Sequence, residues 1–294
     1  KAAEIKNGKR IALVGAGPAS LTVANDLMPL GYECVIFEGL PKAGGLMRTN
    51  IPSFRLPVKV LEEEMDMILD MGVEVHYNHR IDSLKELLDK EGFDAVFVGT
   101  GAPKGKELNI PGREKADANV HIGIEWLESI HFGHVDSVGE NVLVIGVGNT
   151  AMDCCRSSKR LGGKDIKVMA RKSRPYFKAS PWELEDAEDE EVDILVNHAP
   201  QKFVLEDGRL TGMVFDIVEW QENEAGRLVS NKIDEVFLPA DDVILAIGQD
   251  NAFPWIERDI GIEFGEWDMP VVDRATFMTT REDVFVGGDA AWGP

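Results

Sequence analysis

Residues 10–21 read "RIALVGAGPASL", a short apolar strand followed directly by a glycine-spaced turn and the start of a helix. In such a turn Gly15 permits the tight bend, and Gly17 lets the backbone approach a pyrophosphate. Ser20 is a small residue at the third glycine position, where it still allows close helix packing. Pro18 suits the first helical turn, because its missing N–H costs nothing there. The spacing therefore predicts a unit that binds a dinucleotide at a helix N-terminus.

A second predicted strand, "CVIFE", ends in Glu38. An acid at the end of the second strand of such a unit holds ribose hydroxyls. A lone glycine-spaced turn can also be no more than a tight connection. Strand, turn, helix and terminal acid in this order favour a nucleotide site.

The pattern is repeated at residues 142–155, "VLVIGVGNTAMDCC", with a further strand, "IKVMA", after the helix. Here Ala170 stands where the acid would be, followed by Arg171 and Lys172. A carboxylate would repel a 2′-phosphate, whereas a guanidinium and an ammonium bind it. The two cations could instead belong to a solvated loop, but the missing acid favours NADP(H).

Two dinucleotide units in one chain suggest a flavin and a nicotinamide that exchange hydride. We expect an α/β protein with two Rossmann-like, three-layer domains that have parallel sheets and small β-meanders. The expected FAD domain covers residues 1–115 and 241–294, with an NAD(P)H domain of residues 116–240 inserted into it. In the second domain "VDILVNHAP" is predicted as one strand, and Asp207-Gly208 as a hairpin turn.

The formal charge of −21 argues against a nucleic-acid partner, because phosphate backbones require clustered cations. The acidic run "ELEDAEDEEVD", residues 183–193, is interpreted as a solvated helix face, with a docking surface for a basic partner as the alternative. No apolar run approaches the ~20 residues that a membrane helix needs, and the N-terminus does not resemble a signal peptide. The expected location is the cytoplasm.

The three cysteines are expected to be structural, Cys34 in a buried strand and Cys154 and Cys155 in a helix. Their spacing suits neither a redox disulfide nor an iron–sulfur cluster. His76 and His79 are expected on opposite faces of a strand. A metal site at His131 and His134 is disfavoured against a surface or capping role, and no metal ligand is assigned.

Seven motifs occur in the order of a known family: "GAGPASL", "FE…GGL", "IPSFRLP", "GTGAP", "GVGNTAMD", "ARKSR" and "VGGDAAWGP". The chain resembles the FAD/NADPH module of the glutamate synthase small subunit over essentially its whole length. It is similar also to the flavin and NADPH portions of dihydropyrimidine dehydrogenase and of the large subunit of ferredoxin-dependent NADPH transhydrogenases. The resemblance implies FAD contacts at Gly15, Gly17, Pro18, Ala19, Ser20, Glu38, Gly45, Leu46, Arg55, Ile81, Gly288 and Asp289. It implies NADPH contacts at Val147, Gly148, Asn149, Thr150, Arg171, Lys172, Lys178, Ala246, Ile247 and Gly248.

The resemblance also implies a function: hydride passes between NADP(H) and FAD, and electrons continue to iron–sulfur centres of a partner domain or subunit. Hydride transfer between the two cofactors needs geometry rather than an obligatory acid or base, so no catalytic side chain is assigned. The alternatives are a self-sufficient NAD(P)H-flavin reductase of a small acceptor and a nucleotide-binding subunit without turnover.

Three departures from the family pattern stand out. The N-terminal domain whose cysteines bind four-iron–four-sulfur clusters is not in this sequence, and family members continue past the position of Pro294. We therefore expect the chain to be part of a longer protein. Lys172 and Lys178 stand where many relatives have arginine, which replaces a planar fork with a point charge and loosens selectivity for NADPH.

Overall fold

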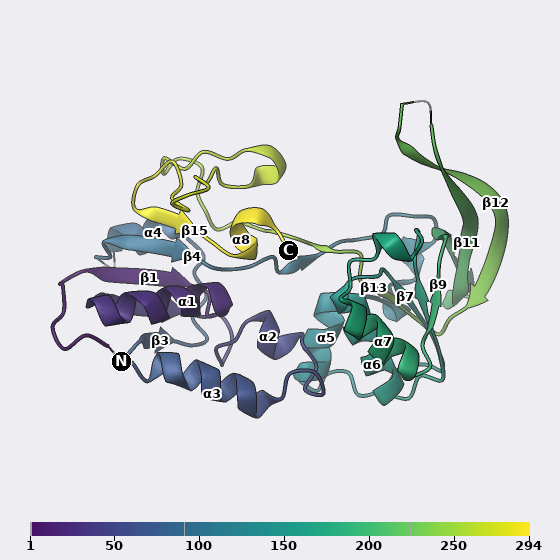
Figure 1. Ribbon diagram of the computed structural model, residues 1–294, viewed down its shortest axis with the longest axis horizontal. Helices are drawn as coiled ribbons and strands as arrows, with labels where there is room; N and C mark the ends of the chain where they lie inside the picture. The colour runs from purple at the N-terminus through teal and green to yellow at the C-terminus, as the bar shows by residue number, and fades with distance from the viewer. Residues whose placement is uncertain (1, 91, 224) are drawn as a thin grey trace. The chain divides into compact units, whose positions relative to one another are not determined.

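The computed structural model describes residues 2–90, 92–223 and 225–294 and separates into two compact units (Figure 1). Unit 1 comprises Lys1–Lys104 and Gln249–Pro294, and unit 2 comprises Gly105–Gly248. The chain leaves unit 1 through β5 (Lys104–Gly105) and returns through β14 (Gln249–Asp250), and these two short strands pair with each other. Unit 2 is therefore inserted, in sequence, between the two parts of unit 1.

Unit 1 is built on a five-stranded parallel sheet. In spatial order its strands are β15 (Val284–Val286), β4 (Ala95–Val98), β1 (Arg10–Val14), β2 (Glu33–Phe37) and β3 (Glu74–His76). Successive side chains of a strand point to opposite faces. Ile11 and Leu13 accordingly enter one hydrophobic cluster, and Ala12 and Val14 another. Both faces of this sheet are covered, as is typical of parallel sheets.

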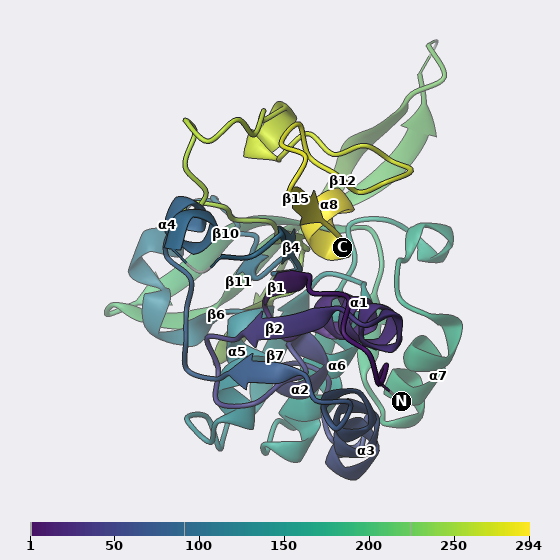
Figure 2. The same cartoon turned by 90° about the vertical axis from the view of Figure 1, so that its left-hand side faces the viewer.

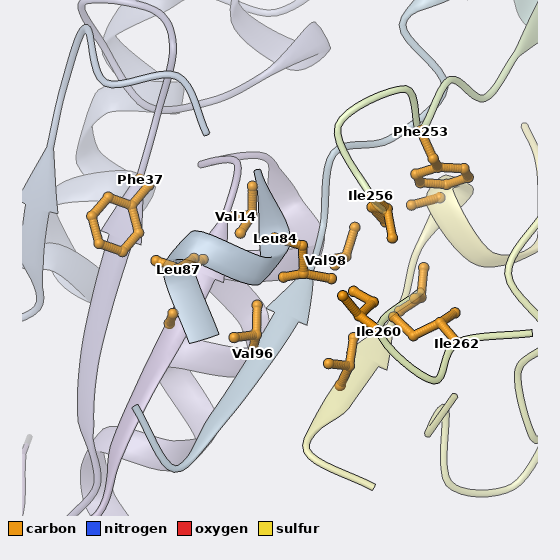
Figure 3. Packing of buried hydrophobic residues seen from close by; sticks show 14 of the residues in the cluster. Val14, Phe37, Leu84, Leu87, Val96, Val98, Phe253, Ile256, Ile260 and Ile262 are labelled. Carbon is orange, nitrogen blue, oxygen red and sulfur yellow. The ribbon is translucent and has the colours of Figure 1, made fainter. Parts of the chain in front are cut away.

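Helices α1 (Pro18–Leu27) and α3 (Val58–Leu69) pack on the face of Ile11 and Leu13. The opposite face is covered by α4 (Leu84–Lys90), by residues 253–262 and by α8 (Asp289–Trp292). Figure 3 shows this second cluster, in which side chains of α4 and of the 253–262 segment meet the strands. A short helix, α2 (Leu46–Thr49), precedes α3.

Unit 2 repeats the three-layer plan (Figures 1 and 2). Its parallel sheet runs, in spatial order, β6 (Val120–Ile122), β13 (Asp242–Leu245), β7 (Asn141–Ile145), β8 (Asp165–Met169) and β9 (Asp193–Leu195). One face carries α5 (Gly123–His131), α6 (Asn149–Arg160) and α7 (Pro181–Asp189). The other carries an antiparallel sheet of β10 (His198–Glu206), β11 (Arg209–Glu222) and β12 (Leu228–Pro239). The expected fold class is confirmed.

The expected domain boundaries need correction, because residues 105–115 and 241–248 belong to unit 2. Strand β13, which we assigned to the first domain, pairs in parallel with β6 and β7 of the second sheet. Its apolar composition suits the centre of any parallel sheet, so sequence alone does not say which sheet it joins.

Two local expectations fare differently. The turn at Asp207 and Gly208 is confirmed: both residues have positive φ, 50° and 79°, as a type I′ hairpin turn requires. The single strand expected at residues 192–200 is wrong. It is interrupted at Asn197, whose φ is 62°, because β9 completes the parallel sheet while β10 begins the antiparallel one.

The acidic run at residues 183–193 is only partly a solvated face. Glu183, on α7, is 4% exposed and pairs with the guanidinium of Arg156 on α6 at 3.3 Å. Asp186 and Glu190 reach the same guanidinium at 2.9 and 3.0 Å. A buried cation on the neighbouring helix therefore draws part of this run inward.

Candidate functional site

The first glycine turn lies at the carboxyl end of β1. Gly15 has a φ of +90°, and a Cβ built on it would be 2.9 Å from the carbonyl oxygen of Gly99, the residue that follows β4. Its N–H donates to the carbonyl of Phe37 at 2.8 Å. Any side chain here would combine an unfavourable backbone conformation with a steric clash, so glycine is required.

The first turn of α1 follows immediately. Gly17 is its N-cap, Pro18 its first residue, and Ala19 comes next. Within the described residues no side chain caps this helix, and its first turn contains no acid. Ser20 is fully buried, and a Cβ built on Gly99 would collide with its hydroxyl oxygen. The turn therefore combines a tightly packed strand–helix junction with a helix N-terminus suited to an anion.

Glu38 follows β2 directly, and its side chain reaches the glycine turn. One carboxylate oxygen accepts the N–H of Ala16 at 2.7 Å, and the other accepts the N–H of Leu40 at 2.8 Å. The residue is 8% exposed. An ionised carboxylate has about four lone-pair sites, so two backbone donors leave capacity for hydroxyl groups.

Residues from distant parts of unit 1 gather at the same edge of the sheet. A Cβ built on Gly45 would be 3.0 Å from the Cα of Gly17, and one on Gly288 would be 2.8 Å from the Cβ of Ala19. The N–H of Gly44 donates to the carbonyl of Ala16 at 2.9 Å. Leu46 and Asp289 begin the short helices α2 and α8 directly after Gly45 and Gly288. Gly99, not among the expected contacts, belongs to this edge as well.

Arg55 and Ile81 are the two remaining expected FAD contacts in unit 1. The backbone N–H of Arg55 donates to the carbonyl of Pro52 within a local turn. Ile81 is half-buried against the cluster on the α4 face of the sheet. Both stay predictions.

The second turn, in unit 2, follows β7 in the same way. Gly146 has a φ of +127°, and a Cβ built on it would collide with the carbonyl oxygen of Ala246. Ala246 follows β13 and donates its N–H to Ile145 at 2.8 Å. Gly148 is the N-cap of α6, which has no side-chain cap within the described residues. Thus the segment Ala246–Gly248 and the first turn of α6, with Asn149 and Thr150, lie at one end of the sheet.

A loop, residues 171–180, is fastened to this second turn. The carbonyl of Val147 accepts the N–H groups of Lys178 and Ala179 at 3.1 and 3.0 Å. The side-chain oxygen of Asn149 accepts the N–H of Ser180 at 2.9 Å. These bonds hold the backbone of Lys178 beside the glycine turn. The side-chain oxygen of Asn149 is therefore used to bind the loop.

The cations of this loop have unequal surroundings. Arg174 pairs with Glu188, whereas no carboxylate in the described part of the chain pairs with Arg171, Lys172 or Lys178. The ammonium nitrogen of Lys172 lies 4.8 Å from the ring centroids of both Tyr176 and Trp220. Sequence reasoning missed these two aromatic residues. Trp220 lies on β11, and no local motif connects it with a loop some fifty positions earlier.

The three thiols are buried in hydrophobic clusters. Burial raises the pKa of Cys34 to about 11 and that of Cys155 to about 12, and it raises the pKa of Cys154 well above the usual range. A thiol reacts as its thiolate, so none of the three is suited to nucleophilic or redox chemistry near neutral pH.

The expectation for His76 and His79 is wrong. Their ring centroids are 5.9 Å apart, and each is 5.2 Å from the ring of Phe37. Strand β3 ends at His76, and Asn78, with a φ of 54°, turns the chain back. The rings of His131 and His134 contact that of Phe132.

Neither a metal site nor a membrane-spanning helix is present among the described residues. No group of three or more His, Cys, Asp or Glu side chains is arranged to hold a metal ion. No described helix combines the length and the apolar character needed to cross a bilayer.

Two parallel sheets, each with a glycine turn at its carboxyl edge, define the class of oxidoreductases that bind two dinucleotides. The chain belongs to the pyridine nucleotide-disulphide oxidoreductase family, which matches residues 9–294. Membership supports FAD and NADP(H) as cofactors.

Curated relatives support the same assignment. The beta subunit of NADP(+)-dependent formate dehydrogenase from Moorella thermoacetica is 36% identical over 98% of this chain and 41% of its own length. The beta subunit of NADPH-Fe(3+) oxidoreductase from Geobacter sulfurreducens is 34% identical over 98% of this chain and 47% of its own length. The NADPH glutamate synthase small chain of Halomonas elongata is 33% identical over 97% of this chain and 63% of its own length. The expected likeness to the glutamate synthase small subunit is confirmed, and the chain spans about half the length of these relatives.

Solved structures confirm the fold. Mycobacterium tuberculosis FprA, in complex with NADPH, superposes with a TM-score of 0.81 at 17% identity, over 97% of this chain and 80% of that one. Thioredoxin reductase from T. acidophilum superposes with a TM-score of 0.71 at 19% identity, over 97% of this chain and 90% of that one.

Proposed function

We propose that this chain is a redox module in which unit 1 binds FAD and unit 2 binds NADP(H), with electrons continuing to iron–sulfur centres of a partner domain or subunit. One observation carries the proposal: the two strand ends differ in charge. Glu38 stands at the end of β2, whereas Ala170 is followed by Arg171 and Lys172 at the end of β8. A carboxylate suits ribose hydroxyls, and cations suit a 2′-phosphate.

The residues of unit 1 fit FAD. The uncapped N-terminus of α1 offers backbone N–H groups to a pyrophosphate, and Gly15 and Gly17 let that group come close. Glu38, whose carboxylate accepts two backbone N–H groups, would accept the ribose hydroxyls with its remaining lone pairs. FAD, when bound, supplies a flavin that exchanges hydride with a nicotinamide and single electrons with other carriers. We assign its contacts to Gly15, Gly17, Pro18, Ala19, Ser20, Glu38, Gly45, Leu46, Arg55, Ile81, Gly288 and Asp289.

The residues of unit 2 fit NADP(H). The chain has a formal charge of −21, yet Arg171, Lys172 and Lys178 have no carboxylate partner among the described residues, which suits an anionic ligand. The N-terminus of α6 offers backbone donors to the pyrophosphate, while the Ala246–Gly248 segment lies against the same turn. We assign NADP(H) contacts to Val147, Gly148, Asn149, Thr150, Arg171, Lys172, Lys178, Ala246, Ile247 and Gly248.

The partner is inferred from the relatives. They are named as beta subunits or small chains, and this chain covers 41 to 63% of their lengths. The three buried thiols offer no route for electrons within the chain. An iron–sulfur domain or subunit elsewhere in the complex therefore accepts them in our proposal.

The test is anaerobic titration of the FAD-loaded protein with NADPH, followed by the visible absorbance of the flavin. Bleaching by NADPH is expected. Bound flavin that stays oxidised would contradict the module and favour a nucleotide-binding subunit without turnover. Rapid reduction of a quinone or small disulfide by this chain alone would favour a self-sufficient reductase.

Cofactor choice is tested with Arg171→Ala. A hydrogen bond to a charged group contributes about 1.5–3 kcal/mol, so the variant should bind NADPH roughly 10- to 150-fold more weakly. NADH, which lacks the phosphate, should bind with unchanged affinity. The matched control is Arg174→Ala, because that guanidinium is already paired with Glu188. Equal losses for both nucleotides would show that Arg171 does not contact the phosphate.

A further inference from the structure

We propose that Trp220 is a positioning residue that sets the preference of unit 2 for a 2′-phosphorylated nucleotide. The inference rests on the proposed binding of NADP(H) by unit 2. It adds a residue that lies outside the glycine turn, outside the basic loop and outside every motif quoted above.

One indole contacts both residues at the end of β8. The Nε1–H of Trp220 donates to the carbonyl oxygen of Arg171 at 2.9 Å. The ring of Trp220 also lies 4.8 Å from the ammonium nitrogen of Lys172. Trp220 comes from β11, where it pairs with Ser230 of β12, so a regular strand carries this contact to the loop.

The hydrogen bond fixes the main chain from which the Arg171 guanidinium extends. Arg171 is exposed, and a long exposed side chain loses rotamer freedom when it binds a ligand. Anchoring its carbonyl removes part of the backbone freedom before the ligand arrives, and such preorganisation lowers the cost of binding.

The aromatic rings hold the Lys172 ammonium without neutralising it. Both Trp220 and Tyr176 lie within the ~6 Å over which a ring attracts a cation. A carboxylate would hold the side chain too, but it would cancel the charge, as Glu188 does for Arg174. A ring leaves the positive charge and its N–H donors for a phosphate. The strand residue therefore keeps a cation in place and available.

The experiment measures binding of adenosine 2′,5′-bisphosphate and of ADP, which lacks the 2′-phosphate, to the FAD-loaded full chain by calorimetry. Trp220→Leu removes the donor and the ring; Trp220→Phe removes only the donor. We expect the bisphosphate to bind roughly 5- to 20-fold more weakly to Trp220→Leu and about 2- to 5-fold more weakly to Trp220→Phe. ADP affinity should change less than about twofold. Trp182→Leu is the matched control, because that tryptophan is 63% exposed on α7.

The outcomes separate the two proposals. Suppose that Arg171→Ala binds the bisphosphate weakly. If Trp220→Leu then binds it as tightly as the unsubstituted chain, or loses affinity for the bisphosphate and ADP equally, the role of Trp220 is overturned while NADP(H) binding stands. If the unsubstituted chain binds the bisphosphate no more tightly than ADP, the proposed cofactor of unit 2 is wrong. Should Trp220→Leu fail to fold, as judged by circular dichroism, Trp220→Phe together with Tyr176→Leu decides the question in the same assay.

Discussion

Gly15 is constrained twice, by its positive φ and by the nearby Gly99 carbonyl, and a matched glycine allows the two effects to be separated. Gly8 has a similar φ of +81°, but no atom lies within 4 Å of the position that a Cβ would take there. Gly8→Ala should therefore cost only the backbone term, about 1–2 kcal/mol. Gly15→Ala should cost roughly 3 kcal/mol or more, because overpacking adds to it, and should abolish FAD uptake. Urea unfolding and FAD titration measure both, and equal costs would contradict the close packing.

What the sequence shows about this edge depends on how local the contacts are. Gly15, Gly17 and Ser20 are predicted correctly as parts of a strand–turn–helix unit because a few consecutive residues determine it. Gly99 could not be assigned, because its contact with Gly15 arises only when β4 pairs with β1. Trp220 was missed for the same reason. The individual cofactor contacts stay predictions.

Helices α6 and α7 are joined through a buried cation, which makes their packing sensitive to one substitution. Arg156→Met would remove the buried guanidinium that pairs with the carboxylate of Glu183, at a cost of about 3–5 kcal/mol. Arg160→Met is the control: its side chain is 43% exposed, and the loss should stay within about 1 kcal/mol. Urea unfolding measures both. Adding Glu183→Leu to Arg156→Met should restore stability, and no recovery would show that the charge is not the cause.

Strand β13 begins with a carboxylate that makes stability depend on pH. Burial raises the pKa of Asp242, but the bonds from His121 and from the N–H of Gly139, both 2.8 Å, outweigh it and leave the pKa below its ordinary value. The folded state therefore favours the ionised form of Asp242. Its contribution to the free energy of unfolding is complete above the unfolded pKa of about 3.9, and it is lost as the pH falls through the lower folded pKa. Unfolding midpoints measured from about pH 6 downward should decline less steeply for Asp242→Asn. An unchanged slope would contradict the assignment.

Strands were easier to recognise than to place. The apolar composition of β13 predicts a strand correctly. Its pairing partners depend on the assembled sheet, so the sequence pattern places the strand in the wrong unit. The break at Asn197 was missed because "VDILVNHAP" has no glycine or central proline to mark it. Glu183 was expected in solvent, because its partner, Arg156, lies on a different helix.

The chain as a whole should transfer electrons without its thiols. Changing Cys34, Cys154 and Cys155 to alanine should leave NADPH-dependent reduction of an artificial dye largely intact, provided the fold survives. In the folded protein, thiol reagents should react far more slowly near neutral pH than in urea, since burial raises all three pKa values. A triple variant that binds FAD and NADPH but reduces no dye would disprove the electron route proposed above.

The insertion of unit 2 also bears on the order in which the protein is made. All of Gly105–Gly248 is translated before β15, the edge strand that pairs with β4. Domains generally fold as units during synthesis, usually in N-terminal order, but here the second unit has its full set of strands first. The sheet of unit 1 stays incomplete until residues 284–286 are made, because one edge of β4 has no partner strand before then. Gly288 then comes to rest against Ala19, so the earliest glycine turn to be synthesised is the last to be completed.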